Sequence, residues 1–366
     1  MAVSRINEAG LNVNQYGNRN LVINGAMQVF QRATAATTAS NNTYQTADRW
    51  KIFESTDGAY TTERSTDTPS GTGYSLKAIV TTADTSIAAT QYASIDHYIE
   101  AQNLQQLQYG TSSAKTLTLS FFVKSNKTGI YTIGLYKPDT TGYMFTKEYT
   151  INSADTWEKK TITITPTAGS TSFITSSGGV IANDNGIGLG LSFNLVWGSN
   201  FNGGTSGAWS ATVANYSTTN AVNWMDTVGN TLLISEVQLE VGDTATDFEH
   251  RTFADELIKC QRYFCFSNVG DAANEPIGGF LGMAENTTRL DSQWTFPVQM
   301  RATPTMTKEA NYIIRVNSNQ TITSASFDST NRGSTWILST GSFVDKEAGR
   351  VYTSAAGPAF SADAEL

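Results

Sequence analysis

The sequence predicts a mainly β protein built on an antiparallel β-sandwich, and three observations support this prediction. First, 52 Thr and 34 Ser stand among the 366 residues, and Thr favours strands together with branched and aromatic residues. Second, short segments that alternate apolar and polar residues are separated by Gly, Asn, Asp and Pro, which is typical of a sandwich. Third, long apolar stripes with helical spacing are nearly absent.

The N-terminal segment, residues 1–20, is polar and contains five Asn and two Gly. It predicts an extended arm without a core of its own. In residues 20–32 two apolar runs flank Asn24 and Gly25, a pair that favours a tight turn. Period-2 patterns and strand-favouring composition then predict strands over residues 47–53, 75–81, 117–124, 130–136 and 159–165. In the third of these, one face is predicted to present Leu117, Leu119, Phe121 and Val123.

Residues 92–107 leave two alternatives open. Ile95, Ile99 and Leu104 stand loosely at helical spacing, but a strand that enters a Gln-rich loop explains the segment equally well. Residues 232–241 predict a further strand, with one face formed by Leu233, Ser235, Val237 and Leu239.

A helix is predicted to begin at Thr252, a suitable N-cap with Asp255 three residues later. Its apolar stripe comprises Phe253, Leu257, Cys260 and Phe264. Beyond it, strands are predicted over residues 295–298, 312–316, 335–338 and 351–352. The expected organisation is therefore an arm (1–20), a sandwich domain (21–250), and a linking helix with a smaller C-terminal β domain (251–366).

Composition excludes several classes of protein. A net charge of −8 argues against binding to nucleic acid or to an anionic membrane. Two His and two Cys cannot form a four-cysteine zinc site or a disulfide framework. No apolar run reaches the length of a membrane-spanning helix, and the first 20 residues lack the apolar core of a secretory signal. We therefore expect a protein made in a cytosol, without membrane insertion.

No catalytic residues are predicted, and we expect a protein that is not an enzyme. Nucleophile and nucleotide motifs are absent. Asp226, Glu236 and Glu240 could be considered for glycoside hydrolysis, which needs two carboxyl groups within about 5 to 9.5 Å. The last two, four residues apart on one strand, would lie roughly 13 Å apart. Cys260 and Cys265 stand among apolar residues and are expected to be buried rather than reactive.

Several segments, taken in order, resemble bacteriophage tail-fibre proteins. They are NLVINGAMQVFQR (20–32), ADRW (47–50), SLKAIVTTADTSIAATQY (75–92), TLSFFVKSNKTGIYTI (118–133), NWMDTVGNTLLISEVQLEVG (223–242), ATDFEHRTFADELIKCQRYF (245–264) and the ending FSADAEL. The resemblance implies a jelly roll of the carbohydrate-binding type followed by a C-terminal β domain. It also implies a virion component, usually a homotrimer, that contacts polysaccharide or lipopolysaccharide on the host surface.

Within that resemblance the arm is expected to dock to other virion proteins. An alternative stays open: a capsid decoration or vertex protein that stabilises the virion and binds sugars weakly or not at all. Related sugar-binding jelly rolls often hold a structural calcium with an acidic residue after the first Asn-Gly. Here Ala26, Met27 and Gln28 follow Gly25, so no metal and no cofactor is predicted, because calcium prefers carboxylate ligands.

Four aromatic residues in the Trp-, Asn- and Gly-rich stretch 194–226 are the candidate glycan-binding residues: Trp197, Trp209, Tyr216 and Trp224. Indole and phenol rings pack against the C–H faces of sugars, while neighbouring Asn and Asp bind hydroxyl groups. The alternative is that these rings fill the sandwich core or a subunit interface, since Trp is frequently buried. Trp50 and Trp157, inside strand patterns, are predicted to be core residues.

Overall fold

The chain divides into two compact units, Met1–Thr252 and Phe253–Leu366, hereafter the first and second unit. The computed structural model describes residues 18–267, 276–308, 312–315, 319–321, 325–331, 334–340, 342–345, 348–353 and 360–366. Most of the predicted arm, residues 1–17, lies outside the described residues. Its last residues, Arg19 and Asn20, are part of the first unit, where they bind Asp247 and Glu249.

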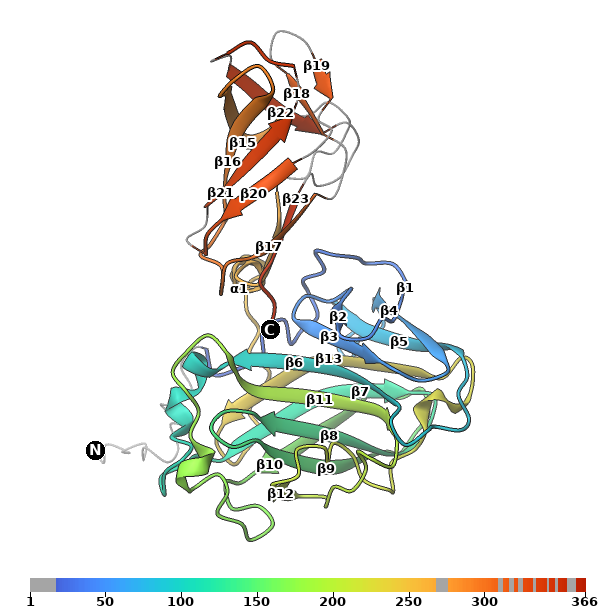
Figure 1. Ribbon diagram of the computed structural model, residues 1–366. Coiled ribbons are helices and arrows are strands. Elements are labelled where there is room, and N and C mark those ends of the chain that lie inside the picture. Colours follow the sequence, from blue (N-terminus) through green and yellow to red (C-terminus); the bar gives the residue numbers. More distant parts are fainter. Residues whose placement is uncertain are drawn as a thin grey trace, which may run out of the picture. The chain divides into compact units, whose positions relative to one another are not determined.

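The first unit is a jelly-roll sandwich of two antiparallel sheets that form two layers, which confirms the predicted fold class (Figure 1). The six-stranded sheet has the order β1 (Thr37–Thr38), β4 (Ala59–Ser65), β5 (Ser75–Thr82), β13 (Thr231–Val241), β7 (Leu117–Ser125), β10 (Glu158–Ile164). The seven-stranded sheet has the order β12 (Ala208–Ser210), β9 (Tyr143–Ile151), β8 (Gly129–Lys137), β11 (Ile187–Trp197), β6 (Tyr92–Glu100), β3 (Trp50–Glu54), β2 (Thr43–Tyr44).

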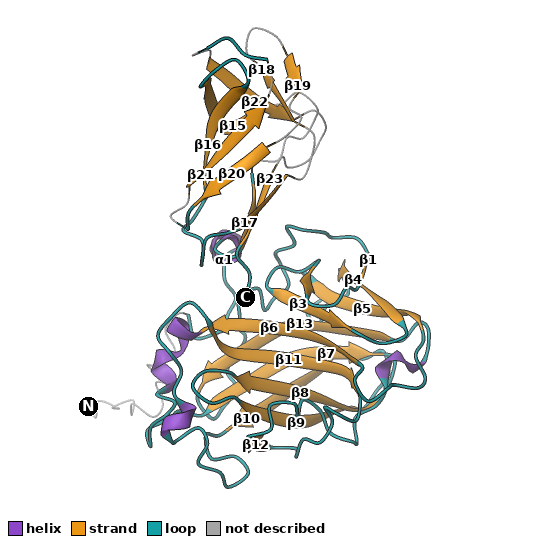
Figure 2. Ribbon diagram, in the orientation of Figure 1, coloured by secondary structure: helices purple, strands orange, loops and turns teal. Residues whose placement is uncertain are grey.

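Short 3₁₀ helices lie at the ends of this sandwich, outside the layers (Figure 2): η2 (Ala101–Leu107), η3 (Ser177–Gly179) and η4 (Trp224–Asp226). The first part of the segment 92–107 is the strand β6, as one of the two alternatives had it. It continues into η2 rather than into a loop, and the apolar Leu104 of η2 is buried.

Strand β7 shows how the sequence pattern builds the core. Leu117, Leu119, Phe121 and Val123 are all fully buried, as their period-2 spacing predicts. The ring of Phe121 makes a T-shaped contact with Phe193 of β11, with 5.0 Å between ring centroids. This contact joins the inner faces of the two sheets.

Strand β13 departs from the predicted alternation. Leu232 and Ile234 belong to the core, and so do Val237 and Leu239, whereas Leu233 does not. The pairing of β13 with β7 shifts between Ser235 and Gln238, and Glu236 has a φ of +51°. One extra residue at this β-bulge reverses the alternation, so the predicted face was wrong before the bulge and right after it. Trp157 was also predicted in the core, but it is only half-buried and donates to Asp67 at 2.8 Å.

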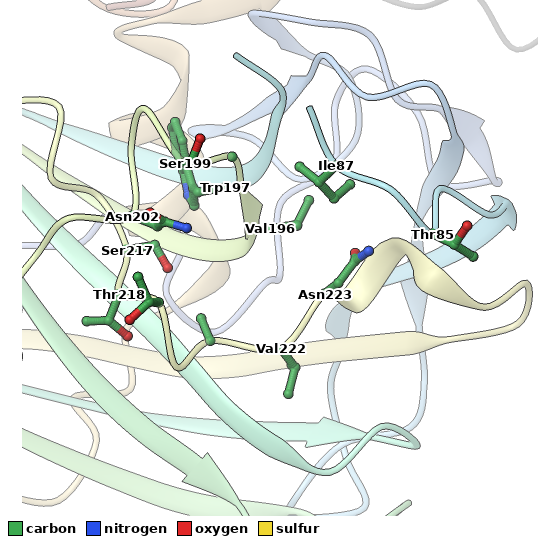
Figure 3. A pocket seen from close by; sticks show the side chains of 13 residues that line it. Thr85, Ile87, Val196, Trp197, Ser199, Asn202, Ser217, Thr218, Val222 and Asn223 are labelled. Atoms are coloured by element: carbon green, nitrogen blue, oxygen red, sulfur yellow. The ribbon is translucent and has the colours of Figure 1, made fainter. Parts of the chain in front are cut away.

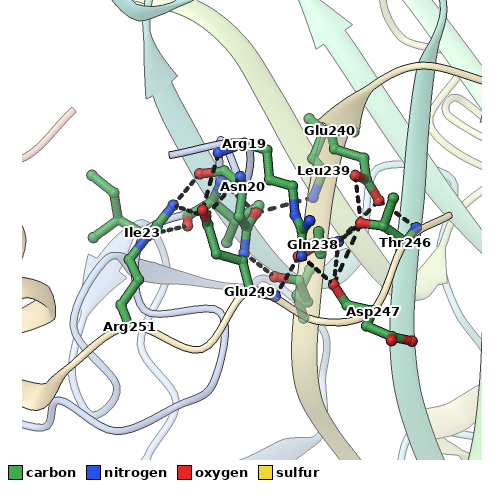
Figure 4. A network of polar contacts seen from close by, with 12 residues as sticks. Arg19, Asn20, Ile23, Gln238, Leu239, Glu240, Thr246, Asp247, Glu249 and Arg251 are labelled. Carbon is green, nitrogen blue, oxygen red and sulfur yellow. Dashed lines mark hydrogen bonds and ion pairs between the residues drawn. The ribbon is translucent and has the colours of Figure 1, made fainter. Parts of the chain in front are cut away.

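A polar network joins the two ends of the first unit (Figure 4). The backbone N–H of Leu21 donates to the carbonyl of Leu239 in β13 at 2.8 Å, and Asn20 Nδ2 donates to Val237 O at 3.0 Å. The Arg251 guanidinium donates to the carbonyls of Asn20 and Val22 and forms an ion pair with Glu249. The segment 19–22 is therefore fixed between β13 and the chain that follows it.

The second unit contains the helix α1 (Phe253–Gln261) and two sheets. A three-stranded sheet has the order β14 (Phe264–Phe266), β23 (Phe360–Asp363), β17 (Thr305–Lys308). A seven-stranded sheet has the order β19 (Asn319–Thr321), β18 (Tyr312–Arg315), β22 (Ala348–Thr353), β15 (Pro276–Ala284), β16 (Arg289–Thr295), β21 (Ser334–Thr340), β20 (Ala325–Ser329).

The predicted helix is confirmed, but its apolar stripe is not. Phe253 is 56% exposed, and Phe264 belongs to β14, where its burial follows from the sheet and not from the helix. Cys260 and Cys265 are both buried, as predicted. The strand expected over 295–298 was misplaced, because β16 ends at Thr295.

Candidate functional site

In the first unit, the outer face of the seven-stranded sheet carries polar and small residues, whereas its inner face carries core residues. Four adjacent strands, β6, β11, β8 and β9, contribute to this face, because side chains alternate along each strand. Their pairing aligns three neighbouring rows: Ser94–Asn194–Thr132–Glu148, then Asp96–Ser192–Gly134–Thr146, then Tyr98–Gly190–Tyr136–Met144.

Residues 215–218 lie over part of this face and bury its polar groups. The carbonyl of Tyr216 accepts from Asn194 Nδ2 at 2.7 Å, and the hydroxyls of Ser217 and Thr132 lie 3.0 Å apart. The Tyr216 ring stacks on Trp197 with 4.3 Å between centroids and an interplanar angle of 5°. The segment therefore brings two of the predicted site residues, Trp197 and Tyr216, onto the same face.

Asn194 has a single possible orientation in this network. Its Nδ2 faces a carbonyl oxygen, which can only accept, and its Oδ1 receives the indole N–H of Trp197 at 2.7 Å. The Ser192 hydroxyl lies between two acceptors, 2.9 Å from Asn194 Oδ1 and 2.6 Å from Asp96 Oδ1. Because Asn194 Oδ1 already accepts the Trp197 indole N–H, the single hydroxyl proton of Ser192 is available to Asp96 Oδ1.

Asp96 is the buried carboxyl group of this face. Burial raises its pKa to about 6, although the hydroxyls of Ser192 and Ser94 and the charge of Lys51 act in the opposite direction. Both serines bind the same oxygen, Oδ1, with the Ser94 bond at 2.8 Å. Oδ2 accepts from neither serine. A carboxyl group whose pKa is displaced in this way, beside a hollow, is a candidate for ligand recognition.

The pKa of Asp96 predicts a pH dependence of stability. In the unfolded chain the pKa is near 3.8, so between about pH 4 and pH 6 the folded protein binds more protons than the unfolded one. The contribution of Asp96 is favourable below pH 4 and is lost as the pH rises through 6, by up to about 3 kcal/mol. Asp96→Asn, which keeps Oδ1 as an acceptor, should therefore raise the melting temperature at pH 7.5 more than at pH 4. Equal differences at both pH values would contradict the assignment.

A narrow slot opens beside Asp96. Its lining comprises Asp96, Tyr98, Gly134, Tyr136, Met144, Gly190, Ser192 and Tyr216. The slot holds about 10 Å³, close to the space of one water molecule. At Gly190 a Cβ would lie 2.7 Å from the Tyr98 ring, so glycine allows that ring to lie close over β11. The slot admits a hydroxyl-sized group and no sugar ring.

A larger hollow of about 340 Å³ lies where β11 ends (Figure 3). Figure 3 shows Trp197, Ser199 and Asn202 on one side and Ile87 and Thr85 on the other. Val196, Gly198 and residues 217–219 and 221–223 complete the lining. Trp197 borders this hollow and Tyr216 borders the slot, so the stack of these two rings separates the two spaces.

The other two predicted site residues lie elsewhere. Trp209 is 3% exposed, contacts Phe145 in the core and donates its indole N–H to Thr165 O at 3.0 Å. Trp224 is fully buried and packs edge-on against Tyr60, with 5.6 Å between centroids. Neither indole presents a face to a ligand, because each fills the core. Of the four predicted rings, Trp197 lines the hollow and Tyr216 lines the slot, and Trp197 stacks on Tyr92 as well as on Tyr216.

Sequence reasoning predicted Tyr216 but missed Asp96, Ser192, Tyr98 and Tyr136. A signal for them exists in the alternation: Ser94, Asp96 and Tyr98, like Gly190, Ser192 and Asn194, stand at every second position. Apart from His97, the residues between them are apolar. On an outer face such positions are ordinarily solvated. Only the segment 215–218, folded over them, makes them a buried site.

The carboxylates considered for hydrolysis are engaged elsewhere. Asp226 forms an ion pair with Lys127 at 2.7 Å, and although its partial burial raises the pKa, the Lys127 hydrogen bond and charge lower it overall. Glu240 is buried and accepts from Gln238 and Thr246. A general acid needs a raised pKa, so Asp226 does not suit that role. Across the described residues, no cluster of three His, Cys, Asp or Glu could hold a metal ion, and no helix is long and apolar enough to cross a membrane.

No family of known sequences matches the chain, and neither does any curated protein. Similar solved structures include a Bacteroides thetaiotaomicron protein provisionally described as sugar-binding (14% identity, 61% of this chain and 100% of that chain, TM-score 0.35). A family 11 carbohydrate-binding module of a Clostridium thermocellum cellulase is 13% identical over 60% of this chain and 99% of that chain, with a TM-score of 0.28. Bacteriophage CBA120 tailspike protein 4 is 13% identical over 61% of this chain but only 22% of that chain, with a TM-score of 0.30. Similarity this low indicates neither ligand nor partner.

Proposed function

We propose that the first unit binds a glycan at the large hollow and that the protein attaches a bacteriophage to glycans on its host surface. The observation that supports sugar binding is the set of hydrogen-bonding groups around the hollow. The side chains of Thr85, Ser199 and Asn202 line it, and none of them binds another side chain or backbone group in the described part of the chain. Hydroxyl and amide groups left open in a concave site suit a ligand rich in hydroxyls.

The hollow is also of a suitable size and polarity. About 340 Å³ is within the range of small-molecule sites, and Ile87, Val196 and Val222 provide an apolar part of the lining. Sugars combine apolar C–H faces with hydroxyls, so a mixed lining matches them better than a purely polar or purely apolar one. Single contacts of this kind are weak, and attachment would depend on several copies acting together.

Filling the hollow tests this proposal. Thr219 is exposed and lines the hollow, so Thr219→Trp should fill the space without disturbing the core. We expect at least a tenfold loss of affinity for a bound polysaccharide in a panel of host-type surface glycans, measured by biolayer interferometry. Thr212→Trp is the matched control, because Thr212 is exposed in the same stretch and does not line the hollow. Binding that Thr219→Trp leaves unchanged would refute this site.

The phage role is supported by the collinear sequence segments quoted above. The proposed phage role includes a homotrimer, docking to the virion through the arm of residues 1–20, and glycan binding without catalysis. A monomer mass in light scattering at micromolar concentration would refute the trimer. Labelling intact virions separates tail attachment from the alternative role in capsid decoration. A reducing-end assay on host polysaccharide would reveal hydrolysis if the binding-only proposal were wrong.

A further inference from the structure

The Asp96 slot has the features of a built recognition site rather than a packing defect. Asp96 is 5% exposed, and its carboxyl group is bonded by the hydroxyls of Ser94, Ser192 and Tyr98. Both serines engage Oδ1, which leaves Oδ2 without a serine donor. Tyr98, Tyr136 and Tyr216 line the slot around the carboxyl group.

The electrostatics of the slot are negative and only weakly compensated. Lys51 is the cation that acts on Asp96, and its effect on the pKa is smaller than those of burial and of the serine hydrogen bonds. The Lys51 ammonium lies 5.2 Å over the Tyr98 ring rather than in an ion pair with Asp96. A second negative charge brought into this space would meet a buried carboxylate in a region of low dielectric.

We propose that the slot is a charge-selective subsite that accepts one hydroxyl group of a neutral glycan and rejects glycans that carry a carboxylate at that position. This inference rests on the proposed function and specifies its substrate class. The slot accommodates a hydroxyl but not a sugar ring, and the ring itself lies outside it. The ligand hydroxyl donates to the Asp96 carboxylate, a hydrogen bond to a charged group that is stronger than a neutral one.

The test compares acidic polysaccharides with the same polymers after carbodiimide-mediated reduction of their uronic acids, which converts each carboxylate into a neutral hydroxymethyl group. We expect the wild-type protein to bind at least one reduced polymer about tenfold tighter than the acidic polymer from which it was made. Asp96→Asn should lose about tenfold in affinity for the neutral polymer and most of the discrimination. Asp155→Asn controls for net charge, because Asp155 is exposed in the turn between β9 and β10.

A second variant tests the space without removing the charge. A Cβ at Gly134 would lie 3.3 Å from the Met144 sulfur and 3.7 Å from the Ser192 Cβ. Gly134→Ala therefore fills the slot while the flexible methionine adjusts, and it should also weaken binding of the neutral polymer about tenfold. The charge-selective slot alone would be overturned if the wild-type protein bound acidic polymers as tightly as their reduced forms. It would also be overturned if Asp96→Asn and Gly134→Ala both bound the neutral polymer as tightly as the wild type. Failure of every glycan to bind would overturn the proposed function itself.

Discussion

Replacing Trp224 by alanine is expected to lower the melting temperature of the first unit by roughly 10 °C. The indole is fully buried and packs against Tyr60, and truncation of a buried Trp costs about 3–5 kcal/mol. In a domain of this size each kcal/mol corresponds to about 2–4 °C. Trp209→Ala should have a similar effect, because Trp209 is also in the core. Differential scanning calorimetry of the full chain measures both.

Phenylalanine substitutions at the same positions separate packing from hydrogen bonding. The Trp224 indole N–H has no hydrogen-bond partner among the described residues, so Trp224→Phe removes an unsatisfied buried donor and should cost little. The Trp209 indole N–H donates to Thr165 O, which also accepts from the Ala168 N–H at 3.1 Å. Trp209→Phe therefore removes one of two hydrogen bonds to that carbonyl and should cost about 0.5–1.5 kcal/mol. A Trp209→Ala variant with unchanged melting temperature and lost glycan binding would restore Trp209 to the binding surface.

These tryptophans show where sequence reasoning succeeds and where it ends. Period-2 spacing identified the core face of β7, because regular strands alternate strictly between the two faces. The same rule failed in β13, where Glu236 adopts a positive φ at a β-bulge. No Gly or Asn stands there to predict the bulge from the sequence. For the stretch 194–226, composition predicted aromatic rings but could not assign them to core or surface. That assignment depends on contacts with Phe145, Tyr60 and Tyr92, which are distant in sequence.

Only part of the candidate site was predictable, because the burial of its residues also depends on segments distant in sequence. Trp197 lies at the end of β11, inside the predicted stretch, and borders the hollow. Asp96 could not be singled out, because its burial arises from the segment 215–218, more than a hundred residues away in the chain. The alternation of polar and apolar residues places Asp96 on the outer face, where side chains are ordinarily solvated. It carries no information about the segment that covers Asp96.

Removing the Arg251 guanidinium is the second change for which we expect a large loss of stability. Arg251→Met keeps much of the aliphatic stem but leaves the carbonyls of Asn20 and Val22 without their donor and Glu249 without its cation. Glu249 is partly buried, which raises its pKa. The Asn20 N–H and Arg251 lower that pKa overall, so Glu249 stays ionised at neutral pH. Breaking such a pair on one side typically costs about 3–5 kcal/mol.

The loss should begin at a defined place, and this distinguishes the network from general destabilisation. The segment 19–22 is held by Arg251 and by the bond from Leu21 N–H to Leu239 O, so its amides should exchange with deuterium much faster in Arg251→Met. Amides of β7, an inner strand of the sheet that contains β13, should exchange faster only to the extent that global stability falls. Arg64→Met, which alters an exposed arginine on β4, should change the melting temperature by less than about 2 °C. If Leu21 stays as protected in Arg251→Met as in the wild type, then the backbone bonds to β13 suffice. In that case Arg251 does not hold the N-terminal segment against the sandwich.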